Sequence, residues 1–322
     1  MERTKSLDNW LKQQFHATPY SFAPASADAS FRRYFRVRLP ERTLIVMDAP
    51  PAHEDCRPFI HVAKWLRDAG VNAPEVLAQD LAQGFLLLSD LGERTYLAAL
   101  DENSADALYR DATEALIKIQ LSSRSGALPD YDDALLRREM RLFPDWYVSK
   151  HLQCKLSAGQ AAQLEETFDL LNRNILAQGQ VFVHRDYHSR NLMVHERNPG
   201  VLDFQDAVHG AVTYDLVSLF KDAYIRWDEE RVLDWTIRYW EKAKKAGLPV
   251  DADFAAFYRD FEWMGAQRHI KVLGIFARLY HRDGKDNYLK DMPLVMAYLR
   301  KTCERYRELH PLVKLLEDLH QC

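Results

Sequence analysis

Hydrophobic and polar positions change their spacing near residue 92. Before it, short apolar runs alternate with polar residues, whereas after it apolar residues recur mainly at helical intervals. In the first part, the predicted helices span 6–15 and 55–69, and the predicted strands span 31–39, 43–48, 74–79 and 84–90. This pattern is typical of a small antiparallel sheet with one covering helix.

The rest of the chain is predicted to be mainly helical. The expected helices span 104–121, 132–152, 158–177, 229–246, 252–280 and 291–309. Two β-like runs interrupt them, one opening at 181 and one at 200–204. We therefore predict an α+β protein of two lobes, 1–91 and 92–322, with the boundary in the turn-like SDLGERT at 89–95. A cleft between two lobes is where a small-molecule site is expected.

Composition narrows the class of protein. The 322 residues are 47% hydrophobic, which is enough for a sizeable core, and the net charge of -4 argues against a phosphate-backbone-binding surface and hence against nucleic acid as a partner. No apolar run reaches the roughly 18 residues of a membrane span, and the first 15 residues lack the apolar core of a signal peptide. We therefore expect a cytoplasmic protein, and no feature of the sequence indicates an obligate protein partner.

The four cysteines are far apart and form no C-x-x-C pair. They are Cys56, Cys154, Cys303 and Cys322. This spacing suggests neither a disulfide scaffold nor a zinc site, and it is consistent with a reducing compartment.

The stretch VFVHRDYHSRNLMV at 181–194 encloses a dense polar group between two apolar runs. Asp186 and Asn191 lie five residues apart in it, and Asp203 follows seventeen residues after Asp186. If the β-like runs pair as a hairpin, these oxygen-bearing side chains converge, and hard oxygen ligands of this kind suit Mg²⁺. An Asp-x-x-x-x-Asn alone is also ordinary turn chemistry.

The complete pattern is more specific than that pair. In kinase-type phosphoryl transfer, H-R-D-x-x-x-x-N supplies a base and a metal ligand, and a second Asp holds the metal across the nucleotide phosphates. By this division of labour, Asp186 would accept the proton of the attacking hydroxyl. His184 is interpreted as a structural residue that supports the loop.

These residues carry a family resemblance. HRDYHSRN is similar to the H-G-D-x-H-x-x-N loop of the aminoglycoside phosphotransferase and choline kinase-like superfamily, with Arg185 in place of the usual Gly. LDFQDAVHGAVTYDLVSL, at 202–219, resembles the second motif of that family. The resemblance implies a protein-kinase-like bilobal fold, ATP and Mg²⁺, Asp186 as catalytic base, and Asn191 and Asp203 as metal ligands. It also implies that Asp215 is an acceptor that braces the loop.

Within the superfamily, several stretches look like the bacterial cell-wall amino-sugar kinases. These stretches are DASFRRYFRV, IVMDAPP, LRREMRLFPDWYV and FVHRDYHSRNLMV. Such enzymes phosphorylate the anomeric hydroxyl of N-acetylmuramate and N-acetylglucosamine in peptidoglycan recycling. The resemblance therefore implies an ATP-dependent sugar 1-kinase that acts on a small amino sugar.

The nucleotide side departs from the usual kinase pattern. The loop SADASFRRYF at 26–35 contains no Gly, and TLIVMDAP has Met47 and Asp48 where a V-x-x-K pattern would place its Lys. Arg32 and Arg33 are the candidates to bind the phosphates instead, because a guanidinium chelates phosphate oxygens. The alternative is that both face solvent on an edge strand.

Adenine is expected at the hinge-like LLLSDLG, which is also simply the end of a core strand. The predicted backbone contacts are Ser89, Asp90 and Leu91, next to Leu88. For the sugar, aromatic faces and cationic side chains of the helical lobe are candidates. They are Arg137, Arg138, Trp146, His188, Arg268 and His269. Most such residues are ordinary helix-surface charges or core aromatics.

Three other functions remain open from the sequence. One is another small-molecule kinase of the superfamily, acting on an aminoglycoside, choline or a hydroxylated amino acid. A second is a catalytically silent nucleotide-binding module, suggested by the missing Lys and glycines. A protein kinase is disfavoured, because LDFQD leads directly into GAVTYDL and no D-F-G or A-P-E segment is present.

Overall fold

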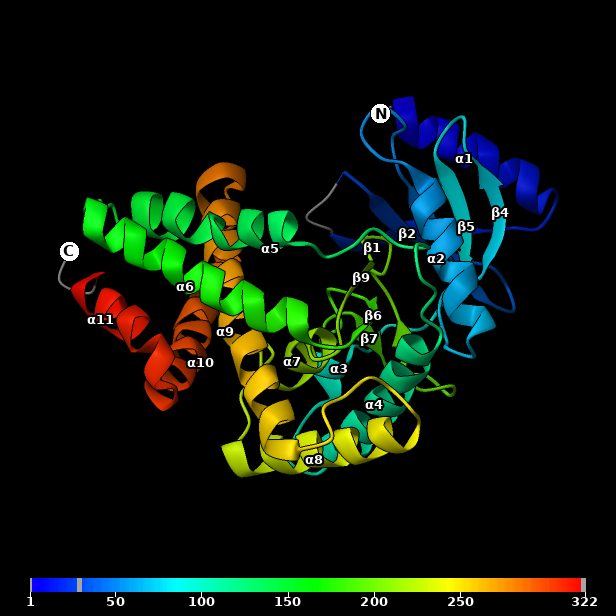
Figure 1. Cartoon of the computed structure of the whole chain (residues 1–322). Helices are drawn as coiled ribbons and strands as arrows, with labels where there is room; N and C mark the ends of the chain where they lie inside the picture. The colour runs from blue at the N-terminus through cyan, green and yellow to red at the C-terminus, as the bar shows by residue number, and fades with distance from the viewer. Residues whose placement is uncertain (1, 28–30, 320–322) are drawn as a thin grey trace. The chain divides into compact units, whose positions relative to one another are not determined.

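The computed structural model describes residues 2–27 and 31–319 and divides into two compact units. Unit 1 comprises Met1–Ala99 and Asn191–Asp206, and unit 2 comprises Leu100–Arg190 and Ala207–Cys322. Unit 1 carries a five-stranded antiparallel sheet, and unit 2 is mainly helical (Figure 1). The predicted α+β class, with a small antiparallel sheet and a larger helical part, is confirmed.

Unit 1 is built around its sheet. Its elements are α1 (Glu2–Phe15), β1 (Ser21–Ala27), β2 (Arg33–Arg38), β3 (Thr43–Asp48), α2 (Cys56–Asp68), β4 (Val76–Asp80), β5 (Phe85–Ser89), α3 (Tyr96–Ala99), β7 (Leu192–Met193) and β8 (Gly200–Val201). The strand order is β1-β2-β3-β5-β4, and all neighbours are antiparallel. The sequence did not predict β1, whose Pro24 and small residues suit an edge strand.

One face of this sheet forms a core with α1. Successive side chains of a strand point to opposite faces, so alternate apolar residues of β2, β3 and β5 gather on the α1 side. The buried residues of this core are Leu7, Trp10, Leu11, Phe15, Phe35, Val37, Leu44, Val46, Phe85 and Leu87. By the same alternation, Arg33 and Asp48, which are register partners of β2 and β3, belong to the face that α1 covers.

The short hairpin β7–β8 belongs to unit 1, although it follows the polar loop in sequence. Val194 N–H donates to the carbonyl of Arg94 at 2.8 Å, and Val201 N–H donates to that of Asn72 at 2.8 Å. Residues 92–99 also pack in unit 1. The units therefore do not follow the predicted single cut at residue 91, because backbone pairing brings a distant segment of the chain into the first unit.

Unit 2 packs around the long helix α9 (Figure 1). Its elements are α4 (Ala105–Leu121), α5 (Asp133–Met140), η1 (Phe143–His151), α6 (Ala158–Ala177), β6 (Gln180–Val183), β9 (Val208–Ala211), α7 (Tyr214–Phe220), α8 (Glu229–Lys245), α9 (Phe254–Asp283), η2 (Asp286–Asp291), α10 (Met292–Arg305), η3 (Arg307–Leu309) and α11 (His310–Leu319). Asp253 caps the start of α9, and Gly284, with a φ of 66°, ends it.

The predicted helix over 132–152 is two elements in the structure. After α5, the backbone widens into the π-helical η1, which has Pro144 in its first turn. A Cβ added at Gly274 of α9 would lie 2.3 Å from the carbonyl carbon of Leu142. Only glycine permits this close approach, so α9 and the start of η1 are tightly packed.

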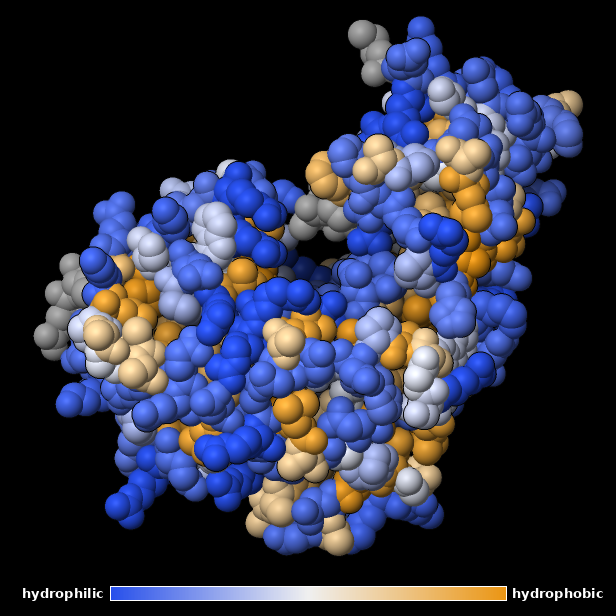
Figure 2. Space-filling model, turned by 45° about the horizontal axis from the view of Figure 1, so that its top comes forward, coloured by the Kyte–Doolittle hydropathy of each residue, from blue (hydrophilic) through white to orange (hydrophobic). Residues whose placement is uncertain are grey.

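Apolar side chains are concentrated in the interior. The face seen in Figure 2 is mostly hydrophilic, and its hydrophobic residues form small separate groups. Within the described ranges, none of the helices combines the length and the apolar character needed to cross a membrane.

Candidate active site

The predicted catalytic loop follows β6 and is held by the first turn of α7. The backbone N–H groups of His184 and Arg185 donate to the Asp215 carboxylate, at 2.6 and 3.0 Å. Arg185 has a φ of 77°, a left-handed conformation that turns the chain sharply at this point. Burial raises the pKa of Asp215 to about 7, although the two N–H groups act in the opposite direction. Asp215 is thus a buried acceptor that ties the loop to α7.

Asp186, the predicted base, is half-buried within unit 2. Burial alone would raise its pKa, but neighbouring positive charges outweigh burial and lower the pKa below its ordinary value. The groups that lower it are Lys271, His188, Arg268 and Arg185. Asp186 is therefore a carboxylate at neutral pH, which is the form that a proton acceptor requires.

His184 lies directly behind this carboxylate in the chain. It is fully buried, and its Nδ1 accepts the backbone N–H of Asp186 at 3.2 Å, so Nδ1 carries no proton. Its ring meets the ring of Tyr187 edge to face, with centroids 5.5 Å apart. These contacts hold the backbone of Asp186 in place.

A buried ionic network lies around the loop. The carboxylate of Glu139, on α5, binds the guanidinium of Arg185 and accepts the hydroxyl hydrogen of Tyr131. The ammonium of Lys271 lies 3.0 Å from the same carboxylate and donates to the hydroxyl of Tyr214 at 2.8 Å. Lys271 belongs to α9, so this network joins the loop to two helices of unit 2.

The predicted metal ligands Asn191 and Asp203 are adjacent in unit 1. Asn191 Nδ2 donates to Asp203 Oδ2 at 3.2 Å, and Leu202 N–H donates to the Asn191 carbonyl at 2.9 Å. This pairing follows from β7 and β8, which form the hairpin, whereas β6 pairs with β9. Asp203 has a φ of 63°, so the chain bends sharply at this predicted ligand.

The donor set of this pair fits Mg²⁺. A carboxylate and an amide oxygen are hard ligands, and Mg²⁺ commonly completes its shell with phosphate oxygens and water. Gln205 Nε2 donates to Asp203 Oδ1 at 2.8 Å, while its buried Oε1 has no hydrogen-bond partner among the described residues. No group of three His, Cys, Asp or Glu side chains suited to a metal occurs in the part of the chain that the structure describes. Gln205 was not predicted, and its position next to the motif was the available signal.

The two arginines predicted to bind phosphate have protein partners. Arg33 donates from Nε to Asp48 at 3.1 Å, and Arg3 of α1 donates to the same carboxylate at 2.6 Å. Asp48 is fully buried, so these two cations compensate its charge on the face that α1 covers.

Arg32 lies in the predicted phosphate loop, immediately before β2. Its Nε is 3.9 Å from the carboxylate of Glu54, and the N–H of Phe31 donates to Glu54 at 3.3 Å. Residues 28–30 of this loop lie outside the described residues.

The predicted hinge is anchored by side chains. Asp90 accepts from Arg36 of β2 at 2.6 and 3.0 Å, an interaction that the sequence did not reveal. The N–H of Ser89 donates to the carbonyl of Glu75 at 2.9 Å, and Ser89 Oγ accepts the N–H of Glu75 at 2.8 Å. Leu91 is buried. The hinge segment is therefore held rigidly within unit 1.

The predicted sugar contacts separate into two groups. His188 and Arg268 belong to the set whose charges act on Asp186, whereas Arg137 binds Glu165 at 2.9 Å and also Asp169 on the α6 surface.

The remaining three predicted contacts lie elsewhere in unit 2. Arg138 is exposed and Trp146 is half-buried on η1. His269 is fully buried, its Nε2 is 3.3 Å from the carbonyl of Lys221, and its ring stacks on Tyr298.

Other residues near the loop carry no motif and were not predicted. The guanidinium of Arg190 lies 3.5 Å above the ring of Tyr224, and its Nη2 is 3.8 Å from Asp291. Asp222 accepts the N–H of Ser189 at 3.0 Å and binds its hydroxyl. Tyr224 also contacts the ring of His188, with centroids 5.5 Å apart, so these residues pack next to the loop. Only the tertiary structure identifies them.

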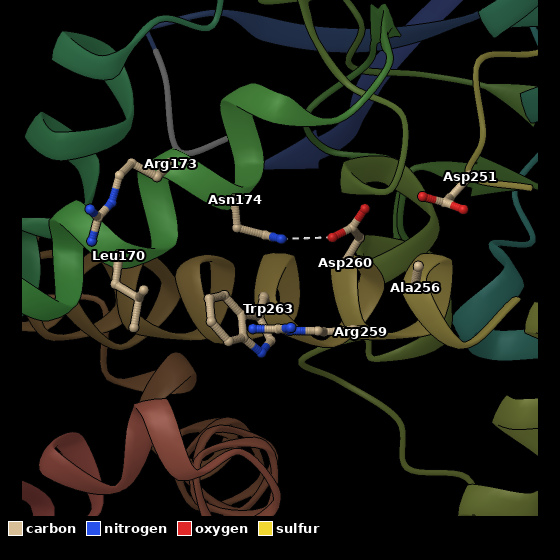
Figure 3. A pocket seen from close by; sticks show the side chains of 8 residues that line it. All are labelled: Leu170, Arg173, Asn174, Asp251, Ala256, Arg259, Asp260 and Trp263. Carbon is tan, nitrogen blue, oxygen red and sulfur yellow. Dashed lines mark hydrogen bonds between the residues drawn. The ribbon is translucent and has the colours of Figure 1, made fainter. Parts of the chain in front are cut away.

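A separate hollow of about 420 Å³ lies between α6 and the start of α9 (Figure 3). Its lining residues are Leu170, Arg173, Asn174, Asp251, Ala256, Arg259, Asp260 and Trp263. Asn174 Nδ2 donates to Asp260 across it at 2.7 Å. None of the predicted site residues lines this hollow.

Residues 21–254 match the model of the phosphotransferase enzyme family, and the chain belongs to this family. It is 53% identical over 321 residues to the N-acetylmuramate/N-acetylglucosamine kinase of Pseudomonas aeruginosa, covering 98% of this chain and 95% of that protein. A protein of the same name from Neisseria meningitidis serogroup B is 49% identical, covering 99% of this chain and 96% of the relative. The predicted enzyme class, a phosphotransferase, is confirmed.

Solved structures show the same fold at low sequence identity. Choline kinase LicA from Streptococcus pneumoniae matches with a TM-score of 0.63 at 12% identity, over 92% of this chain and 99% of that one. Aminoglycoside phosphotransferase APH(2'')-Ib with bound ADP matches with a TM-score of 0.60 at 16% identity, over 92% and 98%. The predicted kinase-like fold is thereby confirmed.

Proposed function

We propose that this chain is an ATP-dependent kinase that phosphorylates the anomeric C1 hydroxyl of N-acetylmuramate and N-acetylglucosamine. The observation that carries the proposal is the half-buried Asp186, whose carboxylate is kept ionised by surrounding cations in the loop of a phosphotransferase. The names of relatives at 53% and 49% identity support the two sugars.

The transfer is direct and in line. The C1 oxygen forms a bond to the γ-phosphorus of ATP as the bond from that phosphorus to the β–γ bridging oxygen breaks. The C1 hydroxyl gives its proton to the Asp186 carboxylate, and ADP leaves with the bridging oxygen. His184 and Asp215 position the base through backbone hydrogen bonds, so no covalent phosphoenzyme is needed.

Asn191 and Asp203 would hold Mg²⁺, which neutralises charge on the phosphate oxygens when it is bound. The backbone of Ser89, Asp90 and Leu91 would contact adenine, and Arg32 or Arg33 would reach phosphate only by releasing Glu54 or Asp48. We place the reaction in the cytoplasm, in peptidoglycan recycling.

The test is a single assay with purified protein, Mg-ATP and each sugar, with the product identified by phosphorus NMR. We expect an acid-labile anomeric phosphate from both sugars. Asp186→Asn should lower turnover by about 10²–10⁴ while the protein remains folded. The matched control is Asp145→Asn, an exposed acid of η1 in the same unit, which should leave turnover unchanged.

Two results would contradict the proposal. Near-normal turnover of Asp186→Asn would show that Asp186 is not the catalytic base. If the wild-type protein phosphorylates choline or an aminoglycoside but neither amino sugar, the proposed substrates are wrong and only the kinase reaction stands.

A further inference from the structure

Two cations one turn apart on α9 differ in how they are compensated. Both Arg268 and Lys271 act on the charge of Asp186. Lys271 is paired, because Glu139 lies 3.0 Å from its ammonium and Tyr214 accepts a hydrogen bond from it. Arg268 forms no ion pair and no hydrogen bond with any residue of the described ranges.

This arginine is also deeply buried. Its exposed fraction is 4%, and its buried Nε and Nη1 have no acceptor within the described part of the chain. An arginine cannot discharge by losing its proton, so burying it without an anion lowers the stability of the ligand-free protein. Such an arrangement is expected where a ligand supplies the missing anion.

The nearby acids have other partners. Asp222 accepts from the backbone and hydroxyl of Ser189 and from the N–H of Tyr224 at 3.2 Å. Asp186 is the proposed base and must remain available for the acceptor hydroxyl. His188 carries an imidazole and no acidic group, so it supplies no negative charge to Arg268. Neither carboxylate forms an ion pair or a hydrogen bond with Arg268, which leaves its buried Nε and Nη1 as donors for an anionic group of a bound reactant.

We infer that Arg268 binds the lactyl carboxylate of N-acetylmuramate and so distinguishes this sugar acid from N-acetylglucosamine, which has no carboxylate. The inference rests on the proposed function. Arg268 is on the same helix face as Lys271, and its charge lowers the pKa of Asp186, His188 and Tyr224. It therefore lies near the proposed base, on the side where the acceptor sugar would bind. A guanidinium and a carboxylate form charge-assisted hydrogen bonds of matching planar geometry.

The experiment compares Arg268→Met and Arg268→Lys with wild type on both sugars. We expect Arg268→Met to raise KM for N-acetylmuramate by about 30-fold or more, with at least a tenfold smaller effect on kcat/KM for N-acetylglucosamine. Arg268→Lys should recover only part of the lost affinity for N-acetylmuramate, because an ammonium lacks the two parallel N–H donors of a guanidinium. Arg259→Met is the matched control on the same helix, since Arg259 pairs with Glu308 and lines the separate hollow.

A binding measurement without turnover guards against a folding defect. Ligand-free Arg268→Met should melt no lower than wild type, because it loses an uncompensated charge, while stabilisation by N-acetylmuramate is lost and that by N-acetylglucosamine is kept. Equal loss of kcat on both sugars would assign Arg268 to the transferred phosphoryl group and overturn the inference. Unchanged KM for both sugars would also overturn it, whereas a wild type inactive on both would refute the proposed function itself.

Discussion

Glu139 binds the guanidinium of Arg185, the residue that stands where the resembling loop usually has glycine. The left-handed φ of 77° explains why glycine is common at this position, since a side chain there is disfavoured. In this chain, the arginine side chain gains a buried carboxylate and lies 5.7 Å from the ring of Tyr131. The ion pair offsets the backbone cost and ties the predicted catalytic loop to α5.

This pair predicts a coupling in stability. Arg185→Gly should lower the free energy of unfolding by about 2 kcal/mol, because breaking a buried pair costs more than the roughly 1 kcal/mol regained at a left-handed position. In the double variant, Glu139→Gln should restore part of the stability lost in Arg185→Gly. Urea denaturation of both single variants and of the double variant measures this coupling. Simple additivity of the two single effects would contradict the coupling.

Asp215 predicts a pH dependence of stability. The pKa of Asp215 is about 7 in the folded protein, whereas the ordinary pKa of an aspartate in an unfolded chain is near 3.8. Between these values the folded state holds a proton that the unfolded state has released, so the contribution is complete below about pH 4 and is lost as pH rises to about 7. Asp215→Asn should remove this component, so its urea midpoint relative to wild type should rise over this pH range. A difference that stays constant with pH would argue against the raised pKa.

The charge of Lys271 should determine how kcat/KM falls at acidic pH. It is the strongest of the charges that lower the pKa of Asp186, so Lys271→Met should raise that pKa. A base is lost when it is protonated, and the fall of kcat/KM on acidification should therefore begin at a higher pH in the variant. The surface variant Lys242→Met, which removes a lysine paired with Glu114, should keep the wild-type profile.

Gln205 should contribute to the affinity of the predicted site for Mg²⁺. Its amide holds one oxygen of Asp203, and partners of this kind typically change metal affinity by about tenfold or more when they are removed. Gln205→Leu should raise the half-activating Mg²⁺ concentration by about tenfold, and Mn²⁺ binding followed by electron paramagnetic resonance should weaken equally. Gln163→Leu, on α6, is the control, and equal affinities in both variants would exclude the role.

The predictions from sequence were strongest where a contact is local. Asn191 and Asp203 are twelve residues apart, and the short hairpin between them makes them adjacent, as the predicted pairing of β-like runs required. Strands β2, β3, β4 and β5 overlap the four predicted strand spans, and α2 ends before the predicted Gly70. The edge strand β1 was missed, because proline and small residues hide its pairing.

The sequence by itself determined the α+β class and the family motifs, including the loop predicted to be catalytic, because these depend on periodicity and short spacing. Only the tertiary structure decided what the scattered charges do. Arg33 is bound to Asp48 because both lie on the α1 face of the sheet, and Lys271 is paired by Glu139 although 132 residues separate them in the sequence. Arg268, one turn away, forms no ion pair with a carboxylate among the described residues. Charges act through distance and burial, and neither can be read from positions along a chain.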